Sequence, residues 1–116
     1  MTSATLKLHL DSVSQAERQG AAKGLALAAE HLLGVSRQQV PHEEGTLERS
    51  GVAHVDGADL AAIVYYDTPY AVRQHEELTW QHDEGRKAKY LEDPMTTERP
   101  TMLALVRAEI RRALRS

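Results

Sequence analysis

The sequence predicts an α+β domain, in which a long N-terminal helix and a C-terminal helix pack on a mainly antiparallel, twisted sheet with a projecting loop. Three observations support this prediction. Stretches with helical spacing lie near both ends of the chain, and short runs rich in β-branched residues lie between them. A polar segment between two prolines follows neither period. The length of 116 residues fits one domain that spans residues 1–116.

The first predicted elements are a strand and a long helix. Residues 5–10 alternate apolar and polar side chains, which is typical of a half-buried strand. Ser14-Gln15-Ala16-Glu17 has the form of a capping box. From about Val13 to Val35 the chain is rich in Ala and Leu at helical spacing, and we expect the helix to end at Gly34 or within 36–39.

Two glycines lie inside this predicted helix. Gly20 and Gly24 are four residues apart, and each costs about 1 kcal/mol relative to Ala in a helix interior. Their spacing allows another backbone to approach closely on one face. We interpret this face as a tight contact within the domain, with a contact between subunits as the alternative.

The middle of the chain predicts a hairpin. Residues 40–45 form a turn or loop because Pro and Gly punctuate them. Residues 46–55 and 60–66 then read as two strands joined by the turn at 56–59. The second strand is almost continuously apolar, which predicts a central strand covered on both faces.

The C-terminal half predicts a loop and a second helix. Residues 70–78 suit one or two helical turns, residues 79–89 suit an exposed loop or an extending hairpin, and residues 90–94 re-enter the body. A helix follows from Glu98 to Leu114, with Thr97 as its cap and Pro100 near its first turn. Its apolar stripe consists of Met102, Leu103, Val106, Ile110, Ala113 and Leu114. Four arginines lie off that stripe, namely Arg107, Arg111, Arg112 and Arg115.

Composition limits the kinds of protein the chain can be. Cysteine is absent, so disulfides and thiolate metal sites are excluded. No apolar run approaches the roughly 20 residues of a membrane span, and no signal-peptide pattern precedes the first strand. We therefore expect a soluble protein without a membrane partner, used inside a cell or in a particle assembled there.

The net charge of −3 conceals a strong asymmetry along the sequence. Residues 42–98 hold thirteen acidic and five basic side chains, whereas residues 99–116 hold five Arg and one Glu. The acidic middle and the basic tail could attract each other within one subunit or between neighbouring subunits. A solvated helix face without a partner is the third interpretation. Nonspecific DNA binding is less favoured, because the sequence has no basic patch with interleaved aromatic residues.

A metal site or an active site is not predicted. His75-Glu76 resembles half of a zinc-protease motif, but the second His is missing because position 79 is Thr. His75 and His82 could gather around a metal with carboxylates from Glu76, Glu77 and Asp83, yet no pair has tight ligand spacing. No nucleophile elbow or glycine-rich phosphate loop occurs. We expect neither catalysis nor a cofactor, and keep a small metal-dependent enzyme or toxin that uses His75, Glu76, His82 and Asp83 as the alternative.

The aromatic residues favour a protein interface instead. The four Tyr and the one Trp all fall within residues 65–90. Tyr, Trp and Arg are common anchors of protein interfaces. The alternative is that the rings fill the core, which we expect for at least one of Tyr65 and Tyr66. The predicted interface residues are Tyr70, Arg73, His75, Glu76, Glu77, Trp80, Arg86, Lys87, Tyr90, Arg111 and Arg115.

Three segments resemble a family of small tail-component and minor capsid proteins of long-tailed bacteriophages. The first runs from Val40-Pro41 to Ser50 and includes Gly45-Thr46-Leu47. The second runs from Tyr65-Tyr66-Asp67-Thr68-Pro69-Tyr70-Ala71 to His75-Glu76. The third runs from Gly85 to Lys89-Tyr90-Leu91-Glu92-Asp93-Pro94. Each motif is short, so the resemblance depends on their order and spacing.

The resemblance implies a head–tail connector-like domain that acts by assembly and without catalysis. It implies a homo-oligomeric ring in the neck of the virion, made in the cytoplasm of the bacterial host and placed between portal and tail tube. Other neck, portal or tail proteins would be its partners, and DNA would be only a passing cargo. The segment 75–89 is longer and more charged than in many relatives. The resemblance therefore leaves head completion, tail completion and tail terminator as open positions.

Overall fold

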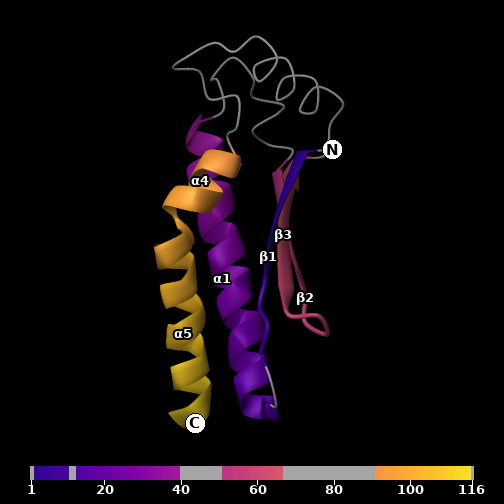
Figure 1. Ribbon diagram of the computed structural model, residues 1–116, viewed down its shortest axis with the longest axis vertical. Coiled ribbons are helices and arrows are strands. Elements are labelled where there is room, and N and C mark those ends of the chain that lie inside the picture. The colour runs from indigo at the N-terminus through magenta and orange to yellow at the C-terminus, as the bar shows by residue number, and fades with distance from the viewer. Residues whose placement is uncertain (1, 11–12, 40–50, 67–90, 116) are drawn as a thin grey trace.

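The computed structural model describes residues 2–10, 13–39, 51–66 and 91–115. The elements are β1 (Thr2–Lys7), α1 (Gln15–Gln39), β2 (Gly51–Asp56), β3 (Ala61–Tyr66), α4 (Glu92–Thr97) and α5 (Arg99–Arg115). Helix α1 lies between the sheet on one side and α5 on the other (Figure 1). The predicted α+β class, with an antiparallel sheet packed by an N-terminal and a C-terminal helix, is confirmed.

The three-stranded sheet has the order β1-β3-β2, and both strand pairs are antiparallel. β3 is therefore central, as predicted. Its residues alternate between a buried face (Ala62, Val64 and Tyr66) and a half-buried face that includes Ile63 and Tyr65. Within the described residues, helices cover only the first face (Figure 1), so the prediction of cover on both faces is wrong for this part of the chain. A continuous apolar run does not distinguish a half-buried second face from a fully buried one.

The strand boundaries differ from those predicted. β1 starts three residues early, because its register pairs Thr2 with Tyr66 at the far end of β3. The predicted alternation holds for Leu6 and for Leu8, whose N–H donates to the Leu60 carbonyl at 2.9 Å. Leu10 lies beyond the strand and is exposed. Residues 46–50, predicted as the start of the second strand, lie outside the described residues.

The turn between β2 and β3 is the predicted hairpin turn. The Asp56 carboxylate accepts hydrogen bonds from the N–H groups of Ala58 and Asp59, at 3.0 and 3.2 Å. Leu60 then adopts a positive φ of 51°, which is uncommon for a residue other than glycine. Its side chain is nevertheless buried in the core. Leu60 thus combines an uncommon backbone conformation with a buried side chain.

Helix α1 begins with the predicted capping box. The N–H of Glu17 donates to the Ser14 hydroxyl at 3.1 Å, and the N–H of Ser14 donates to the Glu17 carboxylate at 2.9 Å. The helix passes through Gly34 and ends at Gln39, within one of the two predicted ends. The pKa of Glu17 is lowered because the Ser14 backbone N–H, and then the Ser14 hydroxyl, bond to its carboxylate.

The lowered pKa of Glu17 predicts a dependence of stability on pH. A folded-state pKa below the unfolded-state value contributes stability above the unfolded pKa, and the contribution is lost as pH falls through the folded pKa. Glu17→Gln should therefore lower the denaturation midpoint at neutral pH, and its difference from wild type should vanish in acid. Urea titrations followed by circular dichroism across this pH range measure the difference. A deficit that persists unchanged in acid would exclude the charge as its cause.

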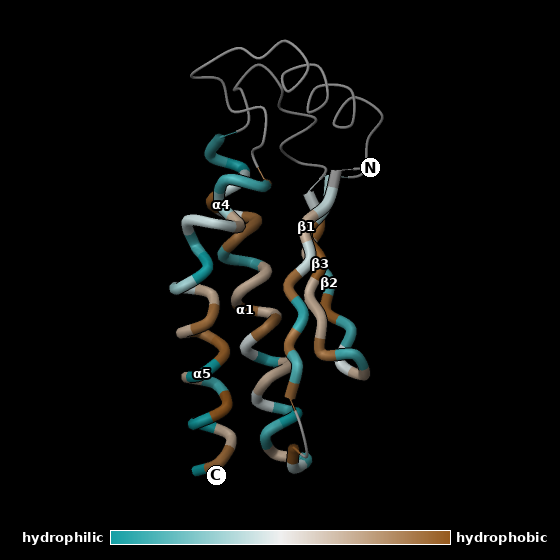
Figure 2. Tube along the Cα trace, viewed as in Figure 1, coloured by the Kyte–Doolittle hydropathy of each residue, from teal (hydrophilic) through white to brown (hydrophobic). Residues whose placement is uncertain are grey.

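The glycines of α1 allow α5 to pack at very short range. A Cβ added to Gly24 would lie 2.5 Å from the Val106 Cα, and one added to Gly20 would lie 2.8 Å from the Ile110 Cα. The prediction of a tight contact within the domain is thus confirmed. Hydrophobic and hydrophilic residues alternate along both helices (Figure 2), as expected for helices that bury one face. The alternative of a subunit contact through the glycines is excluded because α5 occupies their face.

The C-terminal helices differ from the prediction in three details. The short helix α4 was not predicted, although Leu91 and Pro94 are buried and re-enter the body as expected. Thr97 is the last residue of α4 instead of the cap of α5, and its hydroxyl donates to the Glu98 carboxylate at 3.5 Å. Leu114, assigned to the apolar stripe, is 56% exposed. The buried face of α5 instead includes a carboxylate, Glu109.

Candidate interaction site

Most of the predicted interface lies outside the described residues. This holds for Tyr70, Arg73, His75, Glu76, Glu77, Trp80, Arg86, Lys87 and Tyr90. The alternative metal cluster also lies there, with His82 and Asp83. These assignments stay predictions. The described members of the predicted interface are Arg111 and Arg115, and both are exposed on α5.

The described helices and strands, called the framework below, hold the residues that flank 40–50 and 67–90 at one end of the molecule. Gln39 and Gly51 flank residues 40–50, and Tyr66 and Leu91 flank residues 67–90. The end of α1, the start of β2, the end of β3 and α4 all lie toward the same end of the molecule (Figure 1). The register agrees, because Gly51 pairs directly with Tyr66. The resemblance motifs that include residues 40–50, 67–76 and 85–90 are therefore joined to the framework at one end.

Tyr66 is the central anchor of that end. Its side chain is fully buried, and its hydroxyl lies 2.8 Å from the Ser36 hydroxyl of α1. A Cβ added to Gly51 would lie 3.1 Å from the Tyr66 ring and 2.6 Å from the Leu33 side chain. The missing side chain of Gly51 thus leaves room for the ring. Of the two tyrosines at this strand end, Tyr66 fills the core, as expected for at least one of them.

A second contact ties α1 to the start of β2. Arg37 donates a hydrogen bond to the Gly51 carbonyl at 3.2 Å, and the contact is partly buried. Together with the Ser36–Tyr66 contact it fixes the last turn of α1 against β2 and β3. This arrangement places a packed, hydrogen-bonded base beside the points where residues 40–50 and 67–90 attach.

The outer face of α5 is basic. Arg107, Arg111, Arg112 and Arg115 are exposed, and the acidic residue of this helix, Glu109, is 5% exposed. The Arg112 guanidinium donates to the Glu109 carboxylate at 2.7 Å. Within the described part of the chain, no hydrogen bond or ion pair holds the side chains of the other three. The prediction that these arginines lie off the apolar stripe is confirmed.

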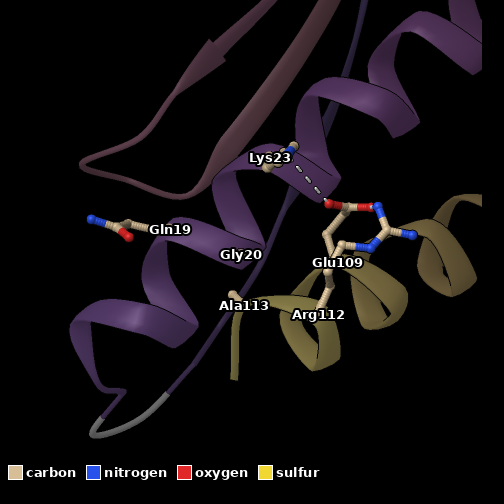
Figure 3. Close-up of a pocket in the computed structure, with 6 residues that line it drawn as sticks. All are labelled: Gln19, Gly20, Lys23, Glu109, Arg112 and Ala113. Carbon is tan, nitrogen blue, oxygen red and sulfur yellow. Dashed lines mark hydrogen bonds and ion pairs between the residues drawn. The ribbon is translucent and has the colours of Figure 1, made fainter. Parts of the chain in front are cut away.

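Glu109 closes a shallow depression between α1 and α5. Its carboxylate lies 3.9 Å from the Lys23 ammonium of α1, and it also accepts the bond from Arg112 (Figure 3). The depression measures about 250 Å³. It is lined by Gln19, Gly20, Lys23, Glu109, Arg112 and Ala113. Both cations are mostly exposed and already pair with the carboxylate, so the cluster joins the two helices and offers no free charge for a ligand.

A third polar contact joins α1 to the start of α5. The His31 imidazole lies 2.6 Å from the Glu98 carboxylate, and both side chains are partly exposed. Sequence analysis did not identify this pair or the Glu109 cluster, because their partners lie 67 residues apart in the first case and on different helices in the second. The spacing of Met102, Val106 and Glu109 on one helix face was the available signal for Glu109.

Among the described residues, no helix covers the outer face of the sheet. Val52 pairs with Tyr65 and His54 pairs with Ile63 on this face, and Thr5 of β1 also pairs with Ile63. Val52 is 38% exposed, while Ile63 and Tyr65 are half-buried. An apolar centre therefore lies among polar neighbours on the side of the sheet opposite α1.

Neither a metal cluster nor a membrane helix occurs in the described residues. No three side chains of the His, Asp and Glu type gather there closely enough to hold a metal ion. Across the same residues, no helix combines the length and apolar character needed to cross a membrane. The metal hypothesis for His75, Glu76, His82 and Asp83 lies outside these residues and receives no support from them.

Comparisons with family models, with curated proteins and with solved structures found no match to this chain.

Proposed function

We propose that the chain is a structural protein of the neck of a long-tailed bacteriophage. It assembles as a homo-oligomeric ring between portal and tail tube, and it contacts other neck, portal or tail proteins without catalysing a reaction. The observation that carries this proposal is that the described residues next to the three resemblance motifs all lie toward one end of the packed helices and sheet (Figure 1).

The close packing of that end supports a role in assembly. Residues 67–90 carry three of the five aromatic side chains, and they are joined to the fully buried Tyr66 on one side and the buried Leu91 on the other. Binding surfaces are most specific when a packed framework supports their attachment points. The Ser36–Tyr66 bond and the burial of Leu91 provide such support.

The layered arrangement also suits a ring. The outer face of α5 and the outer face of the sheet lie on opposite sides of α1 (Figure 1). A contact between different surfaces of identical subunits is heterologous, and it closes into a ring when the rotation per subunit fits. Of the described residues, those on the outer face of α5 and on the outer face of the sheet form two different surfaces for contacts with neighbouring subunits.

The composition of purified virions tests this proposal. Particles should be prepared from the phage genome that encodes the chain, and their proteins identified by mass spectrometry. We expect the chain in several copies per particle, and antibody labelling should place it at the junction of head and tail. Portal, major capsid and tail-tube genes should lie beside its gene. Virions that lack the chain, or labelling confined to the host cytoplasm, would contradict the proposal.

A further inference from the structure

We propose that Arg107, Arg111 and Arg115 on α5 form a docking surface for an acidic surface on a second copy of this chain. The inference rests on the proposed function and names the partner of one face. The three exposed arginines recur every four residues, so they form one stripe that rises about 6 Å per step. The opposite side of α5 is buried against α1 at Met102 and Val106.

Local helix stability does not account for this stripe. A cation is favoured by the helix dipole only in the last turn, which holds Arg112 and Arg115. Arg107 and Arg111 lie before that turn, and Arg112 already bonds to Glu109. Like charges four residues apart on a helix destabilise it. A run of three such arginines is therefore unfavourable for the isolated helix and calls for anionic groups from elsewhere.

The charge distribution of the sequence favours a second copy of this chain as the source of those anionic groups. The whole chain has a net charge of −3, and residues 42–98 hold thirteen acidic against five basic side chains. The exposed acidic residues in the described part of this range include Asp56, Asp59 and Asp93. An acidic molecule repels nucleic acid at long range, whereas a second copy offers its acidic surplus to the basic stripe. Charge complementarity thus favours a copy of this chain over a nucleic acid.

The contact so formed is heterologous. The basic stripe lies on the outer layer of the molecule, and it pairs with a different surface on the next copy (Figure 1). Because exposed ion pairs are individually weak and screened by salt, the contact depends on several pairs together and weakens as ionic strength rises. It is therefore a surface for guiding and aligning subunits, beside the predicted contacts of residues 70–90.

Self-association of the purified full chain tests the stripe. Sedimentation velocity over a concentration series, in low and in high salt, should compare wild type with Arg107→Gln/Arg111→Gln. A matched control is Lys7→Gln/Lys23→Gln, which removes two exposed positive charges from β1 and α1. We expect salt-sensitive association of wild type and control, weakened about tenfold in the stripe variant. Equal association of all three proteins, or none by wild type in low salt, would overturn the inference.

Zero-length cross-linking identifies the occupant directly. In Arg111→Lys the positive charge is kept and an amine becomes available to a carbodiimide, which joins amines to carboxylates. In an equal mixture of isotopically labelled and unlabelled chains, we expect the introduced lysine to be joined to an Asp or Glu of the other copy. Cross-links within one chain only would overturn the inference, as would stripe-dependent binding of duplex DNA without self-association. If virions contain the chain and assemble normally with the stripe variant, the docking surface is wrong while the proposed function stands.

Discussion

Gly24→Ala should destabilise the protein by about 1–3 kcal/mol, although alanine is the better helix former. The added Cβ would lie 2.5 Å from the Val106 Cα and 3.2 Å from the Val106 carbonyl oxygen. Both are backbone atoms, so a rotamer change cannot relieve the overlap and α5 must move away from α1. The separation exposes apolar surface at Met102 and Val106, which are now 1% and 3% exposed. Urea denaturation followed by far-UV circular dichroism measures the loss.

Gly34→Ala is the matched control for this prediction. Gly34 lies in the same helix, and a Cβ added there meets no atom within 4 Å. The substitution should therefore stabilise the protein by up to about 1 kcal/mol through helix propensity alone. If Gly24→Ala is as stable as Gly34→Ala, the close packing of α1 on α5 is not as described.

Tyr66→Ala should have the largest effect of a single core truncation at the end of the sheet, about 3–5 kcal/mol. The ring is fully buried beside Leu33 and Gly51, and its hydroxyl contacts Ser36. Tyr66→Phe removes only the hydroxyl and leaves the Ser36 side chain without this partner, so we expect a smaller loss of about 1–3 kcal/mol. Thermal and urea denaturation measure both losses.

Tyr65→Ala shows how much stability is lost when a tyrosine is truncated on the outer face of the sheet, for comparison with Tyr66 in the core. Tyr65 precedes Tyr66 in β3 but belongs to the outer, half-buried face of the sheet. Truncation there should cost clearly less stability than truncation at Tyr66. Equal losses at the two positions would show that the outer face is as well packed as the inner one, and would contradict its assignment as an uncovered surface.

Local patterns were enough to predict most of the framework. The capping box at Ser14 and Glu17, the turn at Asp56 and the close approach at Gly20 and Gly24 depend on residues a few positions apart or on the absence of a side chain. Propensity and steric arguments apply at that range. The start of β1 was less predictable, because pairing with β3 determines it.

Less of the candidate site could be predicted from the sequence. The exposure of Arg111 and Arg115 follows from helical periodicity, and the structure agrees. The burial of Glu109 depends on Lys23 from another helix, and the position of Tyr66 depends on Ser36 and Gly51. Such contacts arise from the tertiary arrangement, which local patterns do not specify. For the same reason, the continuous apolar run of β3 was taken for a strand covered on both faces.

The most direct test of the central claim is electron microscopy of phage lysates after disruption of the gene for this chain. If the chain joins head and tail as a neck component, the lysate should contain assembled heads and separate tails but few complete virions. Expression of the wild-type chain in trans should restore complete, infectious particles. Complete virions at normal yield without the chain would contradict the account, because a structural part of the neck cannot be dispensable for joining the two assemblies.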